Sequence, residues 1–235
     1  MASQELHRAQ LSILRTLRHA PAARYSELLR PTGLESDAFK FHLRKLVRQN
    51  YVYKSESGAY ELTPSGKEFA NNLSKTDRAV QKQPKLSVVI VAMRETDGTT
   101  EYLFQQRLRN PFYDFWGCLS GPVQWGESFE LAARREFEKQ TGLTAQYTVR
   151  SFYRETDRAL ETDVLLEDKL YVIVIATDVQ GEIANTWQKG FNTWMTLAEL
   201  QGKAKYFAST SEFIQMLTPG THHRAREAHY ADAEY

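Results

Sequence analysis

The sequence predicts a two-domain α/β protein, in which a small helical domain with a β-hairpin precedes a larger domain of strands and helices. Two observations predict this. In residues 1–75 apolar residues recur at helical spacing, whereas from Leu86 apolar runs typical of buried strands alternate with helical segments. A polar stretch, 76–85, separates the two parts and is interpreted as a linker. With 42% hydrophobic and 25% charged residues, the 235-residue chain can build real cores.

The first domain, 1–75, contains helices and one hairpin. In chain order the expected elements are a helix at Leu6–Leu17, a short helix at Tyr25–Arg30, a helix from Ser36 to about Gln49, strands at Tyr51–Lys54 and Ala59–Leu62, and a helix from Thr63 to about Leu73. Ser36 is expected to cap the third helix, and Ser55–Gly58 to form the hairpin turn. Two helices, a turn, a further helix and a hairpin are the order of a winged helix-turn-helix.

The third helix is expected to be the DNA-contacting element. Its predicted inward face is apolar and comprises Phe39, Leu43, Leu46 and Val47. Its predicted outward face is basic, and Lys and Arg outnumber Asp and Glu by 12 to 7 in residues 1–75 but are outnumbered 18 to 22 in the rest of the chain. A basic helix of this kind can neutralise phosphates while it lies in the major groove.

Residues 5–73 resemble the MarR/ArsR-like winged helices of bacteria and archaea. The His-Leu-x-x-Leu pattern of their recognition helix falls on His42, Leu43 and Leu46, and the Leu-Thr-x-x-Gly turn after the wing starts at Leu62 and ends at Gly66. The resemblance implies DNA as a partner. The residues expected at that interface are Ser36, Lys40, Arg44, Lys45, Arg48 and Lys54.

A protein–protein module is the alternative for this domain. Glu56 lies at the tip of the wing, where a carboxylate disfavours close approach to phosphate. Phe41, if exposed, serves a dimer contact as readily as a base contact. His42 is interpreted as a packing residue beside Leu43.

The second domain, 86–218, alternates between strands and helices. The expected strands are Leu86–Met93, Glu101–Gln105, Gln146–Tyr153, Leu170–Thr177 and Thr193–Met195, and the expected helices are Ser128–Gln140, Leu197–Leu200 and Ser209–Leu217. The aromatic and glycine-rich stretch Asn110–Glu127 is interpreted as a loop. The polar tail, 219–235, is expected to be disordered.

Residues 121–143 read GPVQWGESFELAARREFEKQTGL and resemble the Nudix box, G-x5-E-x7-R-E-U-x-E-E-x-G-U, where U is a bulky aliphatic residue. The residues that match in register are Gly121, Glu127, Arg135, Glu136, Gly142 and Leu143, with Phe137 in place of the aliphatic. The flanking sequence extends the resemblance to roughly 85–217. It implies a Nudix α/β/α sandwich with a mixed sheet, and the hydrolysis of a nucleoside diphosphate linked to another group.

The helix that should bind the metal has lost carboxylates. In the family, glutamates on one helical face hold Mg²⁺ or Mn²⁺ against the pyrophosphate, and here that face carries Glu136, Lys139 and Gln140. Glu136 is therefore the one expected metal ligand, and a weak one, while Glu127 and Arg135 remain as further remnants of the catalytic box. We expect weak hydrolysis or none, unless a carboxylate such as Glu155, Asp157 or Glu161 replaces the missing ligands.

Lys139 leaves two interpretations open. Its ammonium group could hold the phosphate of a ligand without cleaving it, or it could simply pair with Glu136 at i, i+3. Arginines and aromatics flank the expected cleft and could contact phosphate and base. The residues expected to bind the ligand are Arg107, Arg109, Phe112, Trp116, Trp125 and Lys139.

The leading hypothesis is a homodimeric, ligand-responsive transcription regulator with a non-catalytic Nudix domain that binds a nucleotide or nucleotide sugar and needs no cofactor. The alternatives are an active pyrophosphohydrolase that uses Mg²⁺ or Mn²⁺, and a structural adaptor. Known regulators that join the two folds carry the Nudix part first, the reverse of this order. The single cysteine, Cys118, and the lack of an apolar run near the roughly 20 residues of a membrane span indicate a cytoplasmic protein without a membrane partner.

Overall fold

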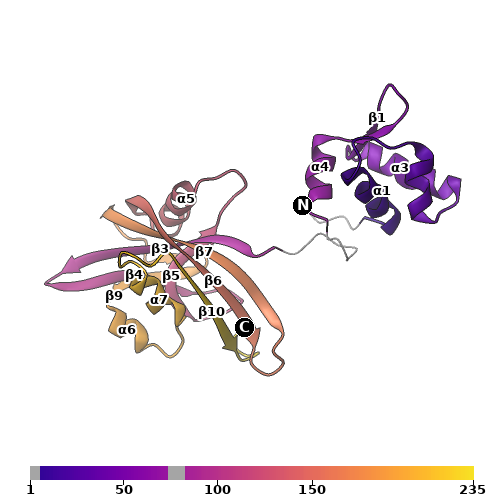
Figure 1. The fold of residues 1–235 in the computed structure, drawn as a ribbon. Helices are drawn as coiled ribbons and strands as arrows, with labels where there is room; N and C mark the ends of the chain where they lie inside the picture. The colour runs from indigo at the N-terminus through magenta and orange to yellow at the C-terminus, as the bar shows by residue number, and fades with distance from the viewer. Residues whose placement is uncertain (1–5, 74–82) are drawn as a thin grey trace. The chain divides into compact units, whose positions relative to one another are not determined.

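The computed structural model of the protein describes residues 6–73 and 83–235. The chain divides into two compact units, Met1–Lys82 and Gln83–Tyr235 (Figure 1). This division falls within the expected linker, 76–85, but residues 76–82 lie outside the described residues, and Lys85 already belongs to a strand. Within the described residues, no helix is long and apolar enough to cross a membrane.

The first unit has the element order expected of a winged helix-turn-helix. Its elements are α1 (Arg8–Arg18), α2 (Tyr25–Leu29), the 3₁₀ turn η1 (Arg30–Thr32), α3 (Ser36–Arg48), the strands β1 (Val52–Lys54) and β2 (Tyr60–Leu62), and α4 (Pro64–Asn71). β1 and β2 pair antiparallel, with Val52 opposite Leu62. Apolar residues spaced along α1 and α3, among them Leu14 and Phe39, are fully buried in one core.

Two local expectations for α3 need correction. Glu35, not Ser36, is the capping residue, and the Ser36 hydroxyl instead lies 3.0 Å from the hydroxyl of Tyr25. Val47 is exposed, although the sequence placed it on the inward face. At 3.6 residues per turn it lies about 80° around the helix from Phe39, so it falls at the margin of the buried stripe.

The second unit is built on one mixed sheet. Its strands are β3 (Lys85–Thr96), β4 (Thr99–Arg107), β5 (Trp116–Pro122), β6 (Thr144–Ala159), β7 (Leu165–Gln180), β8 (Thr186–Trp187), β9 (Gly190–Met195) and β10 (His223–Tyr230). They are ordered β10-β6-β7-β3-β5-β4-β9-β8. β3 runs parallel to β7 and β10 parallel to β6, whereas the other neighbours are antiparallel.

Helices cover both faces of this sheet. α5 (Phe129–Thr141) buries Phe137 against Val88 and Ile90 of β3, while α7 (Ser209–Gln215) buries Phe213 against Val89 and Val91 of the same strand (Figure 1). Alternate residues of β3 therefore face opposite helices, as the two-residue period of a strand requires. A short helix, α6 (Leu197–Gln201), follows β9. The expected α/β/α sandwich with a mixed sheet is confirmed.

Two strands lie where the sequence predicts none. β5 lies inside the expected loop Asn110–Glu127, because its glycines obscure a strand whose Leu119 is buried in the core. The expectation of a disordered tail at 219–235 was wrong, because β10 pairs along its whole length with β6. β10 is polar, but Ala228 and Tyr230 are buried, and a polar segment of this kind becomes a strand through long-range pairing.

Candidate functional site

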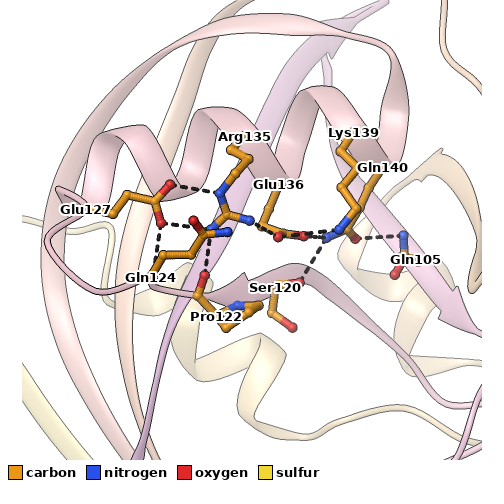
Figure 2. A network of polar contacts seen from close by, with 9 residues as sticks. All are labelled: Gln105, Ser120, Pro122, Gln124, Glu127, Arg135, Glu136, Lys139 and Gln140. Carbon is orange, nitrogen blue, oxygen red and sulfur yellow. Dashed lines mark hydrogen bonds and ion pairs between the residues drawn. The ribbon is translucent and has the colours of Figure 1, made fainter. Parts of the chain in front are cut away.

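Arg135 joins the loop before α5 to the helix itself. Its Nε and Nη2 atoms each donate to a carboxylate oxygen of Glu127 at 2.8 Å, and Nη2 also donates to the carbonyl oxygen of Pro122 at 2.8 Å (Figure 2). The backbone N–H of Gln124 donates to Glu127 at 2.9 Å. Hydrogen bonding to Arg135 lowers the pKa of Glu127 to about 2, so this carboxylate is charged at neutral pH and accepts these hydrogen bonds as an anion.

Glu136 lies at the centre of the network and is surrounded by N–H donors. Its side chain is almost fully buried, with the residue 4% exposed. Nη1 of Arg135 contacts Oε1, the ammonium nitrogen of Lys139 lies 3.7 Å from the same oxygen, and the amide of Gln140 donates to Oε2 at 2.9 Å. Gly121 makes room for this arrangement, because a Cβ atom at 121 would collide with Cγ of Glu136.

This donor set does not fit the divalent metal ion that the Nudix resemblance implies. Mg²⁺ and Mn²⁺ take several oxygen ligands, and a neighbouring cation opposes their binding. The oxygens of Glu136 face a guanidinium, an ammonium and an amide N–H group instead of further carboxylates. Within residues 6–73 and 83–235, no three His, Cys, Asp or Glu side chains come together as a metal-binding cluster.

Gln140 belongs to a buried amide network that connects α5 with β4, β5 and β9. Besides Glu136, its NH₂ group donates to the carbonyl oxygen of Ser120 at 3.1 Å. Its Oε1 atom accepts from Gln105 of β4 at 3.2 Å, and Gln105 also donates to Asn192 of β9 at 2.9 Å. Asn192 in turn donates to the backbone oxygens of Gln140 and Ala184 at 2.7 and 2.9 Å. Gln140 therefore has a structural role that the sequence did not reveal.

Lys139 lies at the edge of the network, with 56% of its side chain exposed. Its Nζ atom lies 5.6 Å from the centre of the Trp187 ring of β8, a cation–π contact, as well as 3.7 Å from Glu136. This geometry is compatible with both interpretations of Lys139, an ion pair with Glu136 and a contact with the phosphate of a ligand. The ammonium pairs with Glu136 and retains an exposed side that a phosphate could reach.

A cavity of about 240 Å³ lies on the α7 face of the sheet. It extends from β3 and β7 to the Ser120–Pro122 end of β5, next to the Gly121 backbone on which Glu136 packs. Its charged lining residues are Lys85, Arg107, Arg109, Lys169, Glu155 and Glu167. It is therefore a polar pocket adjoining the Nudix box.

The structure brings only some of the expected ligand-binding residues to this cavity. Arg107, Arg109 and Phe112 line it, whereas Trp116, Trp125 and Lys139 do not. Trp116 is buried in the cluster around Phe104, and Trp125 is 93% exposed on the loop before α5. Residue spacing alone could not distinguish these environments.

Arg107 and Phe112 line the cavity but also have structural partners. Arg107 donates to the carbonyl oxygen of Pro111 at 3.2 and 2.9 Å, and burial lowers its pKa. Phe112 is buried among Phe115, Phe207, Ala228 and Tyr230. Arg109 is exposed and lines the cavity.

A buried charged cluster lies on β6 and β7. Asp157 is fully buried and paired with Lys169, while Glu155 is 2% exposed and lines the cavity. Burial, opposed by Lys169 and reinforced by Asp157, raises the pKa of Glu155 to about 7. Glu161, the third carboxylate considered as a replacement metal ligand, is exposed in the turn between the two strands.

From the sequence, Glu155 was expected only as a replacement metal ligand. Lys169, Ser209 and Thr210, which also line the cavity, were not predicted. A signal was present. Tyr153, Glu155 and Asp157 lie at alternate positions of one strand, so their side chains lie on the same face of the sheet. Acidic side chains on the face that buries an aromatic residue need a polar partner inside the fold.

The expected DNA-contacting residues lie on one domain and are largely exposed. Ser36, Lys40, Arg44, Arg48 and Lys54 are exposed, and Lys45 is partly buried. Lys40 pairs with Asp37 at 3.2 Å. Within residues 6–73, no acidic side chain forms an ion pair with Arg44, Lys45 or Arg48, so α3 carries free positive charge.

The geometry defines a class of protein. It combines an α/β/α sandwich with a loop–helix segment in which Arg135 bridges Glu127 and Glu136, and in which Glu136 packs on Gly121. The chain belongs to the Nudix family, because residues 83–217 match the NUDIX domain profile. Residues 6–73 match a separate profile, a domain of unknown function (DUF7347).

The second unit is similar to solved structures, and the likeness at a TM-score of 0.50 is one of fold. The NUDIX domain of Shewanella oneidensis NrtR, complexed with ADP ribose, is 18% identical with a TM-score of 0.50, and the alignment covers 66% of this chain and 96% of that one. A MutT NUDIX hydrolase from Burkholderia pseudomallei is 22% identical with a TM-score of 0.48, covering 58% and 100%. At these identities the likeness concerns the fold alone. No curated protein sequence matches the chain.

Proposed function

We propose that this protein is a ligand-responsive, DNA-binding transcription regulator whose Nudix domain binds a nucleotide-type phosphorylated ligand with little or no hydrolysis. The observation that carries the proposal is the environment of Glu136, the one acidic residue on the metal-binding face of the box helix. Its two oxygens are occupied by Arg135, Lys139 and Gln140. A helix that presents N–H donors instead of carboxylates retains the family fold without the means to hold a metal ion and activate water.

ADP-ribose is the first ligand to test. The NUDIX domain of Shewanella oneidensis NrtR has the same fold and is complexed with ADP ribose. In this chain the cavity beside the box is lined by Arg109, which is exposed, and by aromatic side chains that include Tyr171 and Phe207. Guanidinium groups bind phosphate oxygens, and aromatic rings pack against a base.

DNA is the proposed partner of the first domain. α3 presents Arg44, Lys45 and Arg48 without an acidic partner among residues 6–73, as contact with phosphates requires. We propose a homodimer, in which the ligand favours one of two arrangements of the paired domains, and only one arrangement matches half-sites a helical turn apart. Sedimentation of the protein with and without ligand tests the dimer. An adaptor would bind neither DNA nor nucleotides.

Calorimetry and phosphate-release assays on one nucleotide panel test the ligand and the chemistry together. The panel contains NAD, ADP-ribose, nucleotide sugars and nucleoside triphosphates, each with and without Mg²⁺ or Mn²⁺. We expect binding of at least one nucleotide, an affinity that metal leaves unchanged, and no turnover. Metal-dependent turnover near 1 s⁻¹, roughly an ordinary enzymatic rate, would contradict the non-catalytic reading.

An active pyrophosphohydrolase is the second candidate function. Glu155 favours it, because a carboxyl group in the cavity with a pKa of about 7 has the acidity of a general base or acid. The metal would then need ligands other than the Glu136 face. Loss of turnover in Glu155→Gln, with ADP-ribose binding retained, would support this candidate over the regulator.

A further inference from the structure

One wall of the cavity is polar and lacks a free cation. It is formed by Glu155 of β6 and by Ser209 and Thr210 of α7, all of which are at least nine-tenths buried. Ser209 lies close enough to Glu155 to lower the pKa of that carboxyl group. The Thr210 hydroxyl is buried and has no hydrogen-bond partner among the described residues. A buried hydroxyl without a partner costs free energy, so this wall is incomplete without a further hydrogen-bonding group.

Both lysines near this wall are already neutralised, and the Arg107 guanidinium donates to the carbonyl oxygen of Pro111. Lys169 is paired with Asp157, and Lys85 donates to both oxygens of Glu167 at 2.6 and 2.7 Å. A phosphate placed beside Glu155 would meet a carboxyl group and would find no unpaired ammonium. Since a buried charge needs a partner, the wall excludes the phosphate end of a ligand.

Size restricts the occupant further. The cavity holds about 240 Å³, below the roughly 300–1,000 Å³ of pockets that enclose a drug-sized molecule. It therefore accommodates one ring system of a nucleotide, with the remainder of the ligand outside. Phe112, Tyr171, Phe207 and Phe213 also line the cavity and provide apolar and aromatic contact for a planar ring.

We propose that Glu155, Ser209 and Thr210 form a recognition site for the base of the nucleotide ligand, specifically for a base that carries an exocyclic amino group. The carboxyl oxygen of Glu155 accepts from the amino group, and the Thr210 hydroxyl bonds to a neighbouring ring nitrogen. The phosphates extend toward Arg109 at the exposed part of the lining. The inference rests on the proposed nucleotide ligand and identifies the base as the part of the ligand that the protein recognises.

The electrostatics of the wall agree with an uncharged ligand group. Burial raises the pKa of Glu155, and burial also raises the pKa of Asp157, two residues further along the same strand. The two carboxyl groups and Lys169 therefore hold little net charge when one proton is shared between them. A neutral base edge can enter such a site without leaving a charge unpaired.

Three ligands and three variants test the proposal by calorimetry. AMP is compared with purine riboside 5′-monophosphate, which lacks the amino group, and with ribose 5-phosphate, which lacks the base. ADP-ribose is measured in parallel as the ligand of the proposed function. The variants are Thr210→Val, which removes the hydroxyl, Thr210→Ser, which retains it, and the control Glu161→Gln, which changes an exposed carboxylate on the β6–β7 turn.

The unmodified protein should bind AMP about 10-fold or more tightly than ribose 5-phosphate, with purine riboside 5′-monophosphate between them. Thr210→Val should weaken AMP binding about 2- to 12-fold, the effect of one hydrogen bond, and leave ribose 5-phosphate binding unchanged. Its melting temperature without ligand should be unchanged or higher, because the hydroxyl has no partner to lose. Thr210→Ser and Glu161→Gln should bind AMP as the unmodified protein does.

Equal binding of AMP and ribose 5-phosphate, or an equal effect of Thr210→Val on both, would overturn the base-recognition site. If ADP-ribose still bound, the proposed function would stand. Failure of the unmodified protein to bind any of the four ligands, including ADP-ribose, would overturn the proposed function together with this inference.

Discussion

The side-chain amide of Gln140 donates a hydrogen bond of 2.9 Å to Oε2 of Glu136, one helical turn earlier on α5. The Nudix box has a glutamate at this position, where a second carboxylate would repel the first until a metal ion bound between them. An amide donor has the opposite effect, because it satisfies Glu136 without a metal ion. Gln105 and Ser120 hold the amide in this orientation.

Restoring both carboxylates should restore metal binding. In the double variant Lys139→Glu, Gln140→Glu, Glu136 would share its helical face with two further oxygen ligands. We expect Mn²⁺ affinity, measured by calorimetry, to rise at least about 10-fold, since the loss of even a secondary metal contact costs 10- to 100-fold. Mn²⁺ should also raise the melting temperature of the variant, because binding to the folded state stabilises it.

Arg134→Glu is the matched control for that experiment. Arg134 is exposed on the same helix and takes no part in the network, so its replacement adds a carboxylate elsewhere on α5. If Arg134→Glu raised Mn²⁺ affinity as much as the double variant does, the added negative charge on α5 would explain the result. Carboxylates at positions 139 and 140 would then have no specific effect on metal binding.

Replacing Arg135 should destabilise the Nudix domain. Arg135→Ala removes both hydrogen bonds to Glu127 and leaves Glu136 buried with only Lys139 and the Gln140 amide beside its oxygens. We expect a loss of about 2–3 kcal/mol in the free energy of unfolding, below the 3–5 kcal/mol of fully buried pairs because Arg135 is partly exposed. Urea unfolding at pH 7 measures the loss. Arg134→Ala should change stability by less than about 0.5 kcal/mol.

The effect of Arg135→Ala should depend on pH. The pKa of Glu127 in the folded protein is lowered from its ordinary 4.5 to about 2, chiefly by hydrogen bonding to Arg135. A lowered acid pKa contributes stability that is fully present above pH 4.5 and is lost as the pH falls toward 2. The stability difference between the unmodified protein and Arg135→Ala should therefore shrink over this interval. A difference that stayed constant would assign the destabilisation to lost packing.

Gly121 should tolerate no side chain while Glu136 keeps its position. A Cβ atom at 121 would overlap Cγ of Glu136, so Gly121→Ala must displace a buried carboxylate from its donors. We expect about 1–3 kcal/mol of destabilisation from overpacking, measured by urea unfolding. Gly202→Ala is the control, because its Cβ would make only ordinary contacts at 3.5 Å or more. Equal stability of the two variants would contradict the close packing of Glu136 on β5.

Removing cations from α3 should weaken DNA binding and its salt dependence. With Arg44→Ala and Arg48→Ala combined, the slope of log affinity against log salt should fall by about 2, near 0.9 for each lost phosphate contact. Fluorescence anisotropy with a random-sequence duplex at several salt concentrations measures the slope. Lys67→Ala, an exposed cation on α4, should leave it unchanged. The same slope in the unmodified protein, the double variant and Lys67→Ala would contradict the proposal that α3 contacts DNA.

The winged-helix elements and the long strands could be predicted because their signals are local. The period of apolar residues in α1 and α3 is visible within a single helix, and β3 is a continuous apolar run. β5 and β10 could not be predicted, because glycine and charged residues give weak strand signals. Pairing with β3 and β4, and with β6, makes them strands.

By itself the sequence determined the Nudix fold of residues 83–217, because the box residues that define it are close together in the chain. It also established that Lys139 and Gln140 replace carboxylates on the metal-binding face. Only the tertiary structure decided what those replacements do. The partners of Gln140, which include Gln105, come from other strands, and Trp125 and Trp116 differ in burial although both lie near the box. Burial and long-range hydrogen bonding depend on which distant segments the sheet brings together, and no local pattern encodes that.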